Sequence, residues 1–240
     1  MNFHKDILEQ LQSSIVQRDQ DGRHVYTYES KDYFGVSSIL DVIAQTWKMD
    51  YYKKNTAKAI EKRLIETADI GKRIHALIEA DCRGHDVAPQ PDCIAAFENW
   101  KAFKVEHKIE PMANEVMVVN PALGYGGTVD SICMYEGKPM VADYKTGSVG
   151  ITYGYQLAAY RQALIELGVI DESFGMAVFQ IHRDGHVAQP FVYEHYDFCF
   201  QRFLDALGIF RGLNFKKLNN WYGEGKPWNF LTLETRQLGK

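Results

Sequence analysis

The pattern of apolar and polar positions predicts a short β segment near the start of the chain. Apolar and polar side chains alternate over residues 23–28, as they do along a half-buried strand, and a second short strand is predicted around residues 33–34. Residues 38–41 resemble a capping box, and they predict a helix that runs to about Trp47.

Helical spacing then dominates the chain as far as about residue 107. Residues 50–67 and 69–83 have the periodicity of two separate helices, and Gly84 is a stop signal after the second one. Pro91 predicts the start of a third helix, because proline is favoured in the first helical turn. This part of the chain is therefore expected to be mainly helical.

Beyond this point the pattern changes to that of strands. Residues 115–119, 125–135 and 139–145 predict three successive strands, with a turn at 136–138. The elements predicted after them are a helix at 151–167, a hairpin of strands at 175–181 and 187–193, and a helix at 197–212. This order predicts an α/β fold with a central mixed β-sheet flanked by helices, together with an N-terminal helical segment.

The length of the chain favours a single domain, because 240 residues are enough for one sizeable core. We expect residues 1–90 to form a strand and helical segment beside the core, and residues 91–213 to form the core itself. The tail at residues 214–240 contains Trp221, Trp228 and Phe230, so we expect it to pack on the body.

Composition narrows the class of protein. Apolar residues make up 46% of the chain and aromatic residues 13%, which is typical of a folded globular protein. The net charge is −4 and the isoelectric point is about 6.1. A protein that coats DNA is usually basic, whereas a metal enzyme with an acidic pocket need not be.

The cysteines and the N-terminal residues bear on the cellular compartment of the protein. Cys82, Cys93, Cys133 and Cys199 form no C-x-x-C pair, which argues against a zinc ribbon and favours reduced thiols. The chain has no apolar run near the ~20 residues of a membrane span, and its start lacks the features of a signal peptide. We therefore expect a cytoplasmic protein without membrane contact.

The strongest chemical signal is the segment Asp143-Tyr144-Lys145 at the end of an apolar run. Thirteen residues earlier, Asp130 follows Gly126-Gly127-Thr128-Val129, and glycines would let a phosphate backbone approach closely. Side chains alternate along a strand, so Asp143 and Lys145 share a face. Mg²⁺ and Mn²⁺ prefer oxygen ligands, which the two aspartates and the carbonyl of Tyr144 would supply. Lys145 would orient a water or stabilise charge on phosphorus. The alternative is a structural ion pair.

Further candidates surround this centre. Glu115 begins the first predicted strand and would bind the attacking water or a second metal. His75 and Glu79 share a helix face, either as a surface pair or with His75 on a metal or phosphate. Gln156 and Tyr160 are also four apart, either as a core pair or with Gln156 on the metal water or DNA.

Basic and aromatic residues suggest where DNA would run. A stripe of lysines repeats every four residues on one predicted helix, which is either a solvated face or a phosphate contact. Tyrosines near the site would either stack on bases, at about 1–3 kcal/mol each, or pack in the core. The residues predicted to bind DNA are Lys54, Lys58, Lys62, Arg73, Tyr153 and Tyr160.

Taken in order, these motifs resemble the PD-(D/E)XK nuclease superfamily, and its RecB-like subgroup in particular. The segments that carry the resemblance are Glu115, the G-G-T-V-D of residues 126–130, the V-A-D-Y-K-T-G of residues 141–147, the Y-Q-L-A-A-Y of residues 155–160, and the upstream G-K-R-I-H of residues 71–75. Residues 23–28 and 35–40, with Trp47, are similar to phage exonucleases and to the mitochondrial genome-maintenance exonuclease.

The resemblance implies a restriction-endonuclease-like core and metal-dependent exonucleolytic cleavage of DNA, with single-stranded ends favoured. It implies that Asp130 and Asp143 bind Mg²⁺ or Mn²⁺, that Lys145 is catalytic and that His75 assists. It also implies DNA as a partner, a possible recombination or replication partner protein, and the host cytoplasm if the chain is phage-encoded.

Two positions depart from the family pattern. Val129 stands where the superfamily name has proline, and Cys199 is alone where iron–sulfur members have a cysteine cluster, so we expect no iron–sulfur cluster. Two alternatives stay open: an endonuclease of the same fold that cuts at junctions, flaps or specific sites, and a catalytically inactive nucleic-acid-binding protein.

Overall fold

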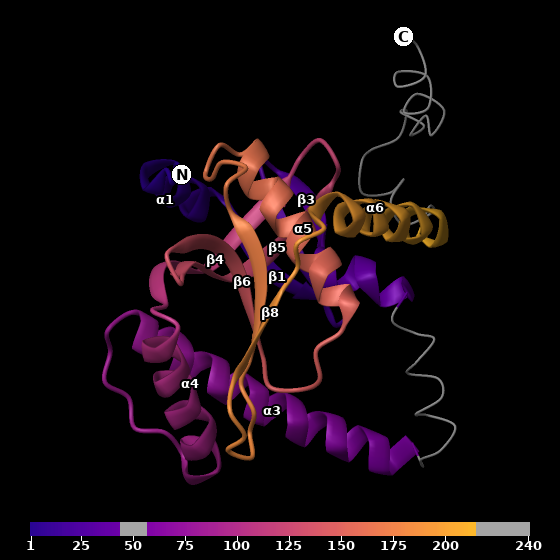
Figure 1. Cartoon of the computed structure of the whole chain (residues 1–240). Coiled ribbons are helices and arrows are strands. Elements are labelled where there is room, and N and C mark those ends of the chain that lie inside the picture. Colours follow the sequence, from indigo (N-terminus) through magenta and orange to yellow (C-terminus); the bar gives the residue numbers. More distant parts are fainter. Residues whose placement is uncertain (44–56, 215–240) are drawn as a thin grey trace, which may run out of the picture.

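The computed structural model describes residues 1–43 and 57–214, and the side chains of residues 1–43 and 68–214. Its architecture is α/β, with one mixed eight-stranded sheet flanked by helices (Figure 1). The elements run in the order α1 (Lys5–Ser14), β1 (Val16–Gln20), β2 (Arg23–Tyr28), β3 (Lys31–Gly35), α3 (Ala57–Cys82), the 3₁₀ turn η1 (Pro91–Cys93), α4 (Ile94–Glu106), β4 (Glu110–Asn120), β5 (Tyr125–Tyr135), β6 (Lys138–Lys145), α5 (Ile151–Glu166), β7 (Gly175–Gln180), β8 (Gln189–Val192) and α6 (Tyr196–Leu213). Residues 36–43 are also helical.

The sheet combines two antiparallel meanders with two parallel pairings, that of β3 with β5 and that of β6 with β7. β1, β2 and β3 are antiparallel neighbours, as are β4, β5 and β6. β6 and β7 are parallel and are joined through α5, and β8 returns antiparallel to β7. A parallel pair needs a crossover of this kind, because its second strand must start at the same end of the sheet.

A fork interrupts the sheet at β5. The edge of β5 that faces away from β4 pairs first with β3, at Tyr125 and Gly126, and later with β6, from Ser131 onward. Residues 127–130 pair with neither strand on that edge. The fork therefore leaves a short stretch of β5 whose backbone groups on this edge have no strand partner, so that side chains or a ligand can approach them.

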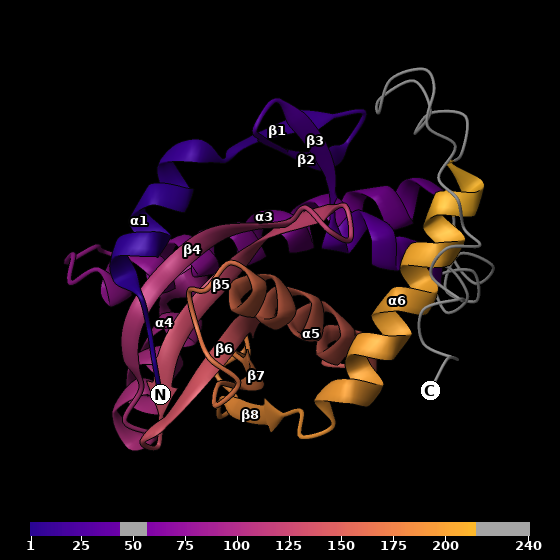
Figure 2. The same cartoon turned by 90° about the horizontal axis from the view of Figure 1, so that it is seen from above.

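Each face of the sheet is covered by its own helices. The larger core packs α5 and α6 on one face, and Figure 2 shows the sheet curving around α5. Helix α1 joins this core at the free edge of β4, where the Gln12 side chain hydrogen-bonds to the backbone of Met117. The smaller core packs α3 and α4 on the other face, where Trp100 and Phe179 are fully buried. Burying a large side chain of this kind stabilises the fold by about 1.5–3 kcal/mol.

The structure confirms the expected mixed sheet and corrects two element boundaries. The prediction of two separate helices at 50–67 and 69–83 is wrong, because residues 57–82 form the single helix α3. The sequence has no glycine or proline between residues 57 and 70 that would end a helix near residue 68. β4 begins at Glu110, which pairs with Met134 before a bulge. Glu115 therefore lies in the middle of this strand and does not begin it. The predicted end at Trp47 and the tail 215–240 lie outside the described residues.

Candidate active site

The candidate site lies at the fork, where the end of β6 separates from β5. The carboxylate of Asp130, on β5, accepts a hydrogen bond from the backbone N–H of Tyr144, on β6, at 2.9 Å. The side chain thus satisfies a backbone group where the regular pairing of the two strands has stopped. Asp130 is 15% exposed, so this end of the sheet is only partly covered.

Asp143 and Lys145 lie next to this carboxylate, on the shared face that strand alternation predicts. The ammonium of Lys145 forms an ion pair with Asp143, whose side chain is only 2% exposed, against 22% for Lys145. Burial, and then the charge of Asp130, raises the pKa of Asp143 to about 6. Burial alone would lower the pKa of Lys145, but the carboxylates of Asp143 and Asp130 outweigh it and raise that pKa. The amine is therefore held protonated.

Helix α5 contributes Gln156 and Tyr160 to the same centre. The Gln156 amide donates to Oδ1 of Asp143 at 3.1 Å, and it also lies 3.3 Å from the hydroxyl of Tyr160. The ring of Tyr160 packs directly over Gly127, since a Cβ there would lie 2.2 Å from the ring. Gln156 is thus positioned by Tyr160 and holds the orientation of the Asp143 carboxylate.

This packing corrects two expectations. Tyr160 is 4% exposed, so its ring is not available to stack on DNA bases. The glycines before Asp130 were expected to admit a phosphate backbone, but tyrosine rings occupy both positions. A Cβ on Gly126 would lie 2.9 Å from Tyr26, just as one on Gly127 would strike Tyr160. The glycine pair serves internal packing.

His75 reaches the site because α3 comes close to the end of β6. A Cβ on Gly71 would lie 3.3 Å from Oγ1 of Thr146, so a small residue is favoured at this crossing. One turn later, Nδ1 of His75 lies 3.6 Å from Oδ2 of Asp130, and its ring packs edge-on against the ring of Tyr144, with the ring centroids 6.1 Å apart. Burial, and then the charge of Lys145, lowers the pKa of His75. His75 therefore faces the acids rather than forming a surface pair with Glu79.

Glu115 approaches the acids from β4. The antiparallel register of β4 and β5 sets it opposite Asp130, and its backbone has a φ of 52°, in the left-handed region. Burial raises its pKa to about 7, with further contributions from Asp130 and Glu79. Glu79 itself pairs with Arg83 at 2.6 Å. The site thus gathers more negative charge than its cations neutralise at close range.

The acids fit a divalent cation of the magnesium type. Within the described ranges, no group of three or more His, Cys, Asp or Glu side chains is arranged to hold a metal ion. Oδ2 of Asp143 is buried next to Lys145, yet it accepts no hydrogen bond of regular geometry. Mg²⁺ commonly binds through one or two carboxylates and keeps several waters, so a full cage is not needed. The two aspartates and the neighbouring carbonyl of Tyr144 match that donor set.

The expected DNA-binding residues are only partly described. Lys54 lies outside the described residues, and so do the side chains of Lys58 and Lys62. Arg73 is engaged by acids, with 2.7 Å to Asp92 and 3.0 Å to Asp69, which makes it a brace between α3 and η1. The ring centroid of Tyr153 lies 5.0 Å from Nζ of Lys145, so this tyrosine borders the site.

One neighbour of the acids was not anticipated from the sequence. The Tyr26 hydroxyl, from β2, lies 3.0 Å from Oγ1 of Thr128, and burial together with the charges of Glu115, Asp19 and Asp130 raises its pKa to about 12. Tyr26 is separated from Thr128 by 102 positions in the chain. The strand pattern of residues 23–28 gave no signal that one of its side chains would reach the acids.

Comparison with known proteins adds no assignment: the sequence matches no protein-family model, and no curated protein matches it. Among the described residues, no helix combines the length and apolar character needed to cross a bilayer.

Proposed function

We propose that this chain is an Mg²⁺- or Mn²⁺-dependent deoxyribonuclease that digests DNA from its ends. The observation that carries the proposal is the convergence of Asp130 and Asp143 from two adjoining strands, with the ammonium of Lys145 paired to Asp143. A pair of acids beside a protonated amine suits a doubly charged cation and an anionic phosphodiester in one site.

Asp130, Asp143 and the carbonyl of Tyr144 would hold the cation, with Glu115 and His75 at its border. A bound Mg²⁺ or Mn²⁺ would polarise the phosphate and lower the pKa of a water molecule. Lys145, held protonated, donates a hydrogen bond to the phosphate oxygens and stabilises the negative charge that develops on them. Gln156 keeps Asp143 oriented through its 3.1 Å hydrogen bond.

Glu115 supplies a group suited to proton transfer. Its pKa of about 7 lies close to neutral pH, where a general base combines availability with basicity. It would accept a proton from the attacking water. His75, whose pKa is lowered, is neutral at the same pH and lies beside Asp130.

The choice of exonuclease follows the resemblance of residues 23–47 and of the central motifs to exonucleases of the RecB-like subgroup. No contact in the described residues separates this activity from endonucleolytic cleavage. The substrate test must therefore include a DNA without ends.

The test is digestion of end-labelled linear DNA, single- and double-stranded, and of a closed circular DNA. Each is incubated with Mg²⁺, Mn²⁺ or a chelator. We expect metal-dependent loss of the linear DNA and an intact circle, and a rate at least about 100-fold lower in Asp143→Asn and Lys145→Ala. Lys138→Ala, at the other end of β6, is the matched control and should keep wild-type activity.

Each other result has a defined meaning. Cutting of the circle would favour the endonuclease. Metal-independent DNA binding that survives Asp143→Asn without turnover would favour an inactive binding protein. No cleavage by folded wild-type protein with either metal, or full activity in Lys145→Ala, would end the proposal.

A further inference from the structure

The loop at residues 181–188 borders the end of the sheet that carries Lys145. β6 and β7 are parallel, and their register sets Lys145 beside Gln180. Both strands therefore deliver their following loops to the same end of the sheet. In open α/β sheets, ligands bind outside the carboxyl ends of the parallel strands.

This loop is held in place at both of its ends. The backbone N–H of Ile181 donates to the carbonyl of Lys145 at 2.8 Å, and the Gln180 side chain donates to the carbonyl of Gly147 at 2.7 Å. At the far side of the loop, the Asn99 side chain, from α4, donates to the carbonyl of His186 at 2.7 Å. The loop is thus tied to the site on one side and to α4 on the other.

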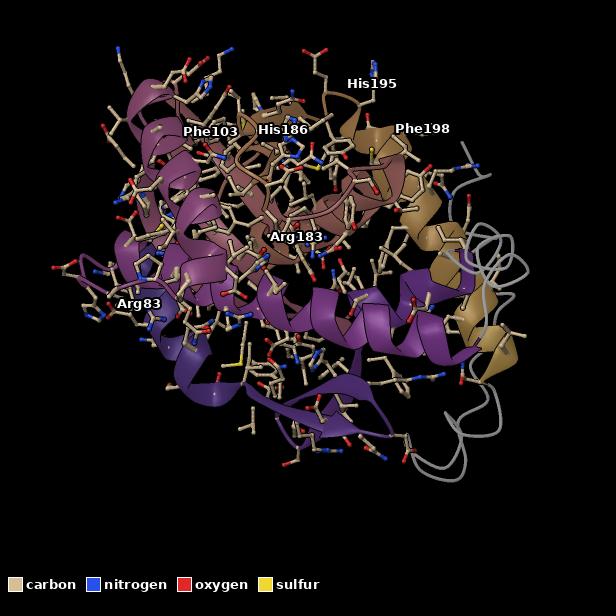
Figure 3. The ribbon with its side chains drawn as sticks, turned by 90° about the horizontal axis from the view of Figure 1, so that it is seen from below. Arg83, Phe103, Arg183, His186, His195 and Phe198 are labelled. Atoms are coloured by element: carbon tan, nitrogen blue, oxygen red, sulfur yellow. The ribbon has the colours of Figure 1, made fainter. Side chains whose placement is uncertain are left out.

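Arg183 is the one arginine of this loop, and no carboxylate in the described part of the chain forms an ion pair with it. It is half-buried, and it forms no ion pair or hydrogen bond with a described residue. The adjacent Asp184 is engaged by His186, at 2.8 Å. Figure 3 shows Arg183 near the middle of the lower face of the molecule, whereas His195 and Phe198 lie at its rim.

We propose that Arg183 binds a backbone phosphate of the DNA strand close to the scissile one, so that the 181–188 loop contacts the bound strand. Three residues of chain span at most about 11 Å, which bounds the Cα separation of Arg183 from Gln180, the neighbour of Lys145. A guanidinium suits this role because it matches phosphate geometry with two hydrogen bonds. The inference rests on the proposed DNA substrate and adds a binding residue to it.

The test measures binding separately from cleavage. Fluorescence anisotropy of a labelled single-stranded oligonucleotide is recorded in chelator and in Ca²⁺ over a range of salt, for wild type, Arg183→Gln, Arg183→Glu and Arg183→Lys. We expect Arg183→Gln to raise Kd about three- to tenfold and to reduce the salt slope by about 0.7, the value for one phosphate contact on a single strand. Arg183→Glu should lose more, and Arg183→Lys should recover most of the affinity.

Kinetics provide a second measurement that a purely structural role would not reproduce. Arg183→Gln should raise KM while kcat stays near the wild-type value, because the residue contacts the strand and not the reacting atoms. Lys138→Gln removes one positive charge at the opposite end of β6 and should leave both Kd and the salt slope unchanged. The thermal unfolding curves of all variants should coincide.

The outcomes separate the two proposals. If wild-type protein binds and degrades DNA while Arg183→Gln has the wild-type Kd and salt slope, the role of Arg183 is refuted and the nuclease proposal stands. If wild-type protein neither binds nor degrades DNA, both fail together. Loss of affinity of equal size in Lys138→Gln would reduce the effect to net charge and would also refute the specific contact.

Discussion

At the scale of single residues, Glu115 combines a strained backbone conformation with a half-buried acid. A non-glycine residue in the left-handed region costs about 1–2 kcal/mol, and here it directs a carboxylate toward another acid. Burial and repulsion then raise its pKa to about 7. Under the proposed function, the proton-transfer role of this carboxylate offsets the cost.

Replacing Glu115 by glutamine should therefore flatten the dependence of stability on pH in metal-free protein. The folded pKa of about 7 lies above the ordinary value of 4.5. The folded state thus binds the Glu115 proton more tightly than the unfolded state does, and this stabilisation of the fold is fully present below pH 4.5 and is lost as pH rises through 7. Between pH 5 and pH 8, wild-type protein should lose about 1–2 kcal/mol more unfolding free energy than Glu115→Gln, after allowance for solvent screening.

Denaturant unfolding in chelator at several pH values measures this difference. Glu110→Gln, which neutralises an exposed acid at the start of the same strand, is the matched control and should follow the wild-type profile. Parallel profiles for wild type and Glu115→Gln would contradict the prediction.

At the scale of elements, the close packing of α5 on β5 depends on the glycine at position 127, which has no side chain. Gly127 lies under the ring of Tyr160, and the same tyrosine lies beside Gln156, which holds Asp143. A change on the strand is therefore transmitted through the helix to the acid. Packing and chemistry share this contact.

Gly127→Ala should lower the free energy of unfolding by about 1–3 kcal/mol, because its Cβ would lie 2.2 Å from the Tyr160 ring and force the helix outward. Gly208→Ala on α6 is the control, since nothing lies within 4 Å of its added Cβ. It should be neutral or slightly stabilising, as alanine favours helix more than glycine does. Equal stability of the two variants in denaturant unfolding would show that Tyr160 moves aside without cost.

The sequence predicted those elements whose pattern is local. The strands near residues 125–135 and 139–145 match β5 and β6, because alternation and the turn between them determine a hairpin. That hairpin also explains why the convergence of Asp130 and Asp143 was predictable. The helix α1 and the strand β1 were not predicted, since their apolar residues are few and their burial depends on distant partners.

The partners of the glycines show the other limit of sequence reasoning. Gly126 and Gly127 were assigned to a ligand, but Tyr26 and Tyr160 fill those positions. These tyrosines come from β2 and α5, so no local spacing connects them to β5. Likewise, the periodicity of 50–67 and 69–83 gave two helices, where one continuous helix exists.

At the scale of the whole molecule, α3 crosses the sheet in step with its strands. Gly71 lies at the exit of β6, His75 beside Asp130 of β5, and Glu79 near Glu115 of β4. Four helical residues rise about 6 Å and neighbouring strands are about 4.8 Å apart. Each successive turn of α3 therefore lies over the next strand of the sheet. The site is therefore assembled from both layers and depends on their relative position.

A cation bound between these layers should stabilise the entire fold. Mn²⁺ at about 100 times its Kd should add about 2.7 kcal/mol to the unfolding free energy, and removal by chelator should reverse the gain. The gain should shrink as pH falls below 6, because protons compete for Asp143, whose pKa is about 6. Thermal unfolding with and without metal measures it, and Asp143→Asn should abolish it. An unchanged unfolding temperature in wild-type protein at saturating metal would contradict the prediction.

The carboxylate that closes the fork between β5 and β6 has a consequence for how variants of Asp130 are interpreted. Alanine at this position would leave the amide hydrogen of Tyr144 without an acceptor. A loss of turnover in that variant could then come either from the missing carboxylate charge or from a distorted end of β6. Asparagine keeps an oxygen in reach of that hydrogen while discarding the negative charge. Only the amide replacement isolates the electrostatic role of this position from its architectural one.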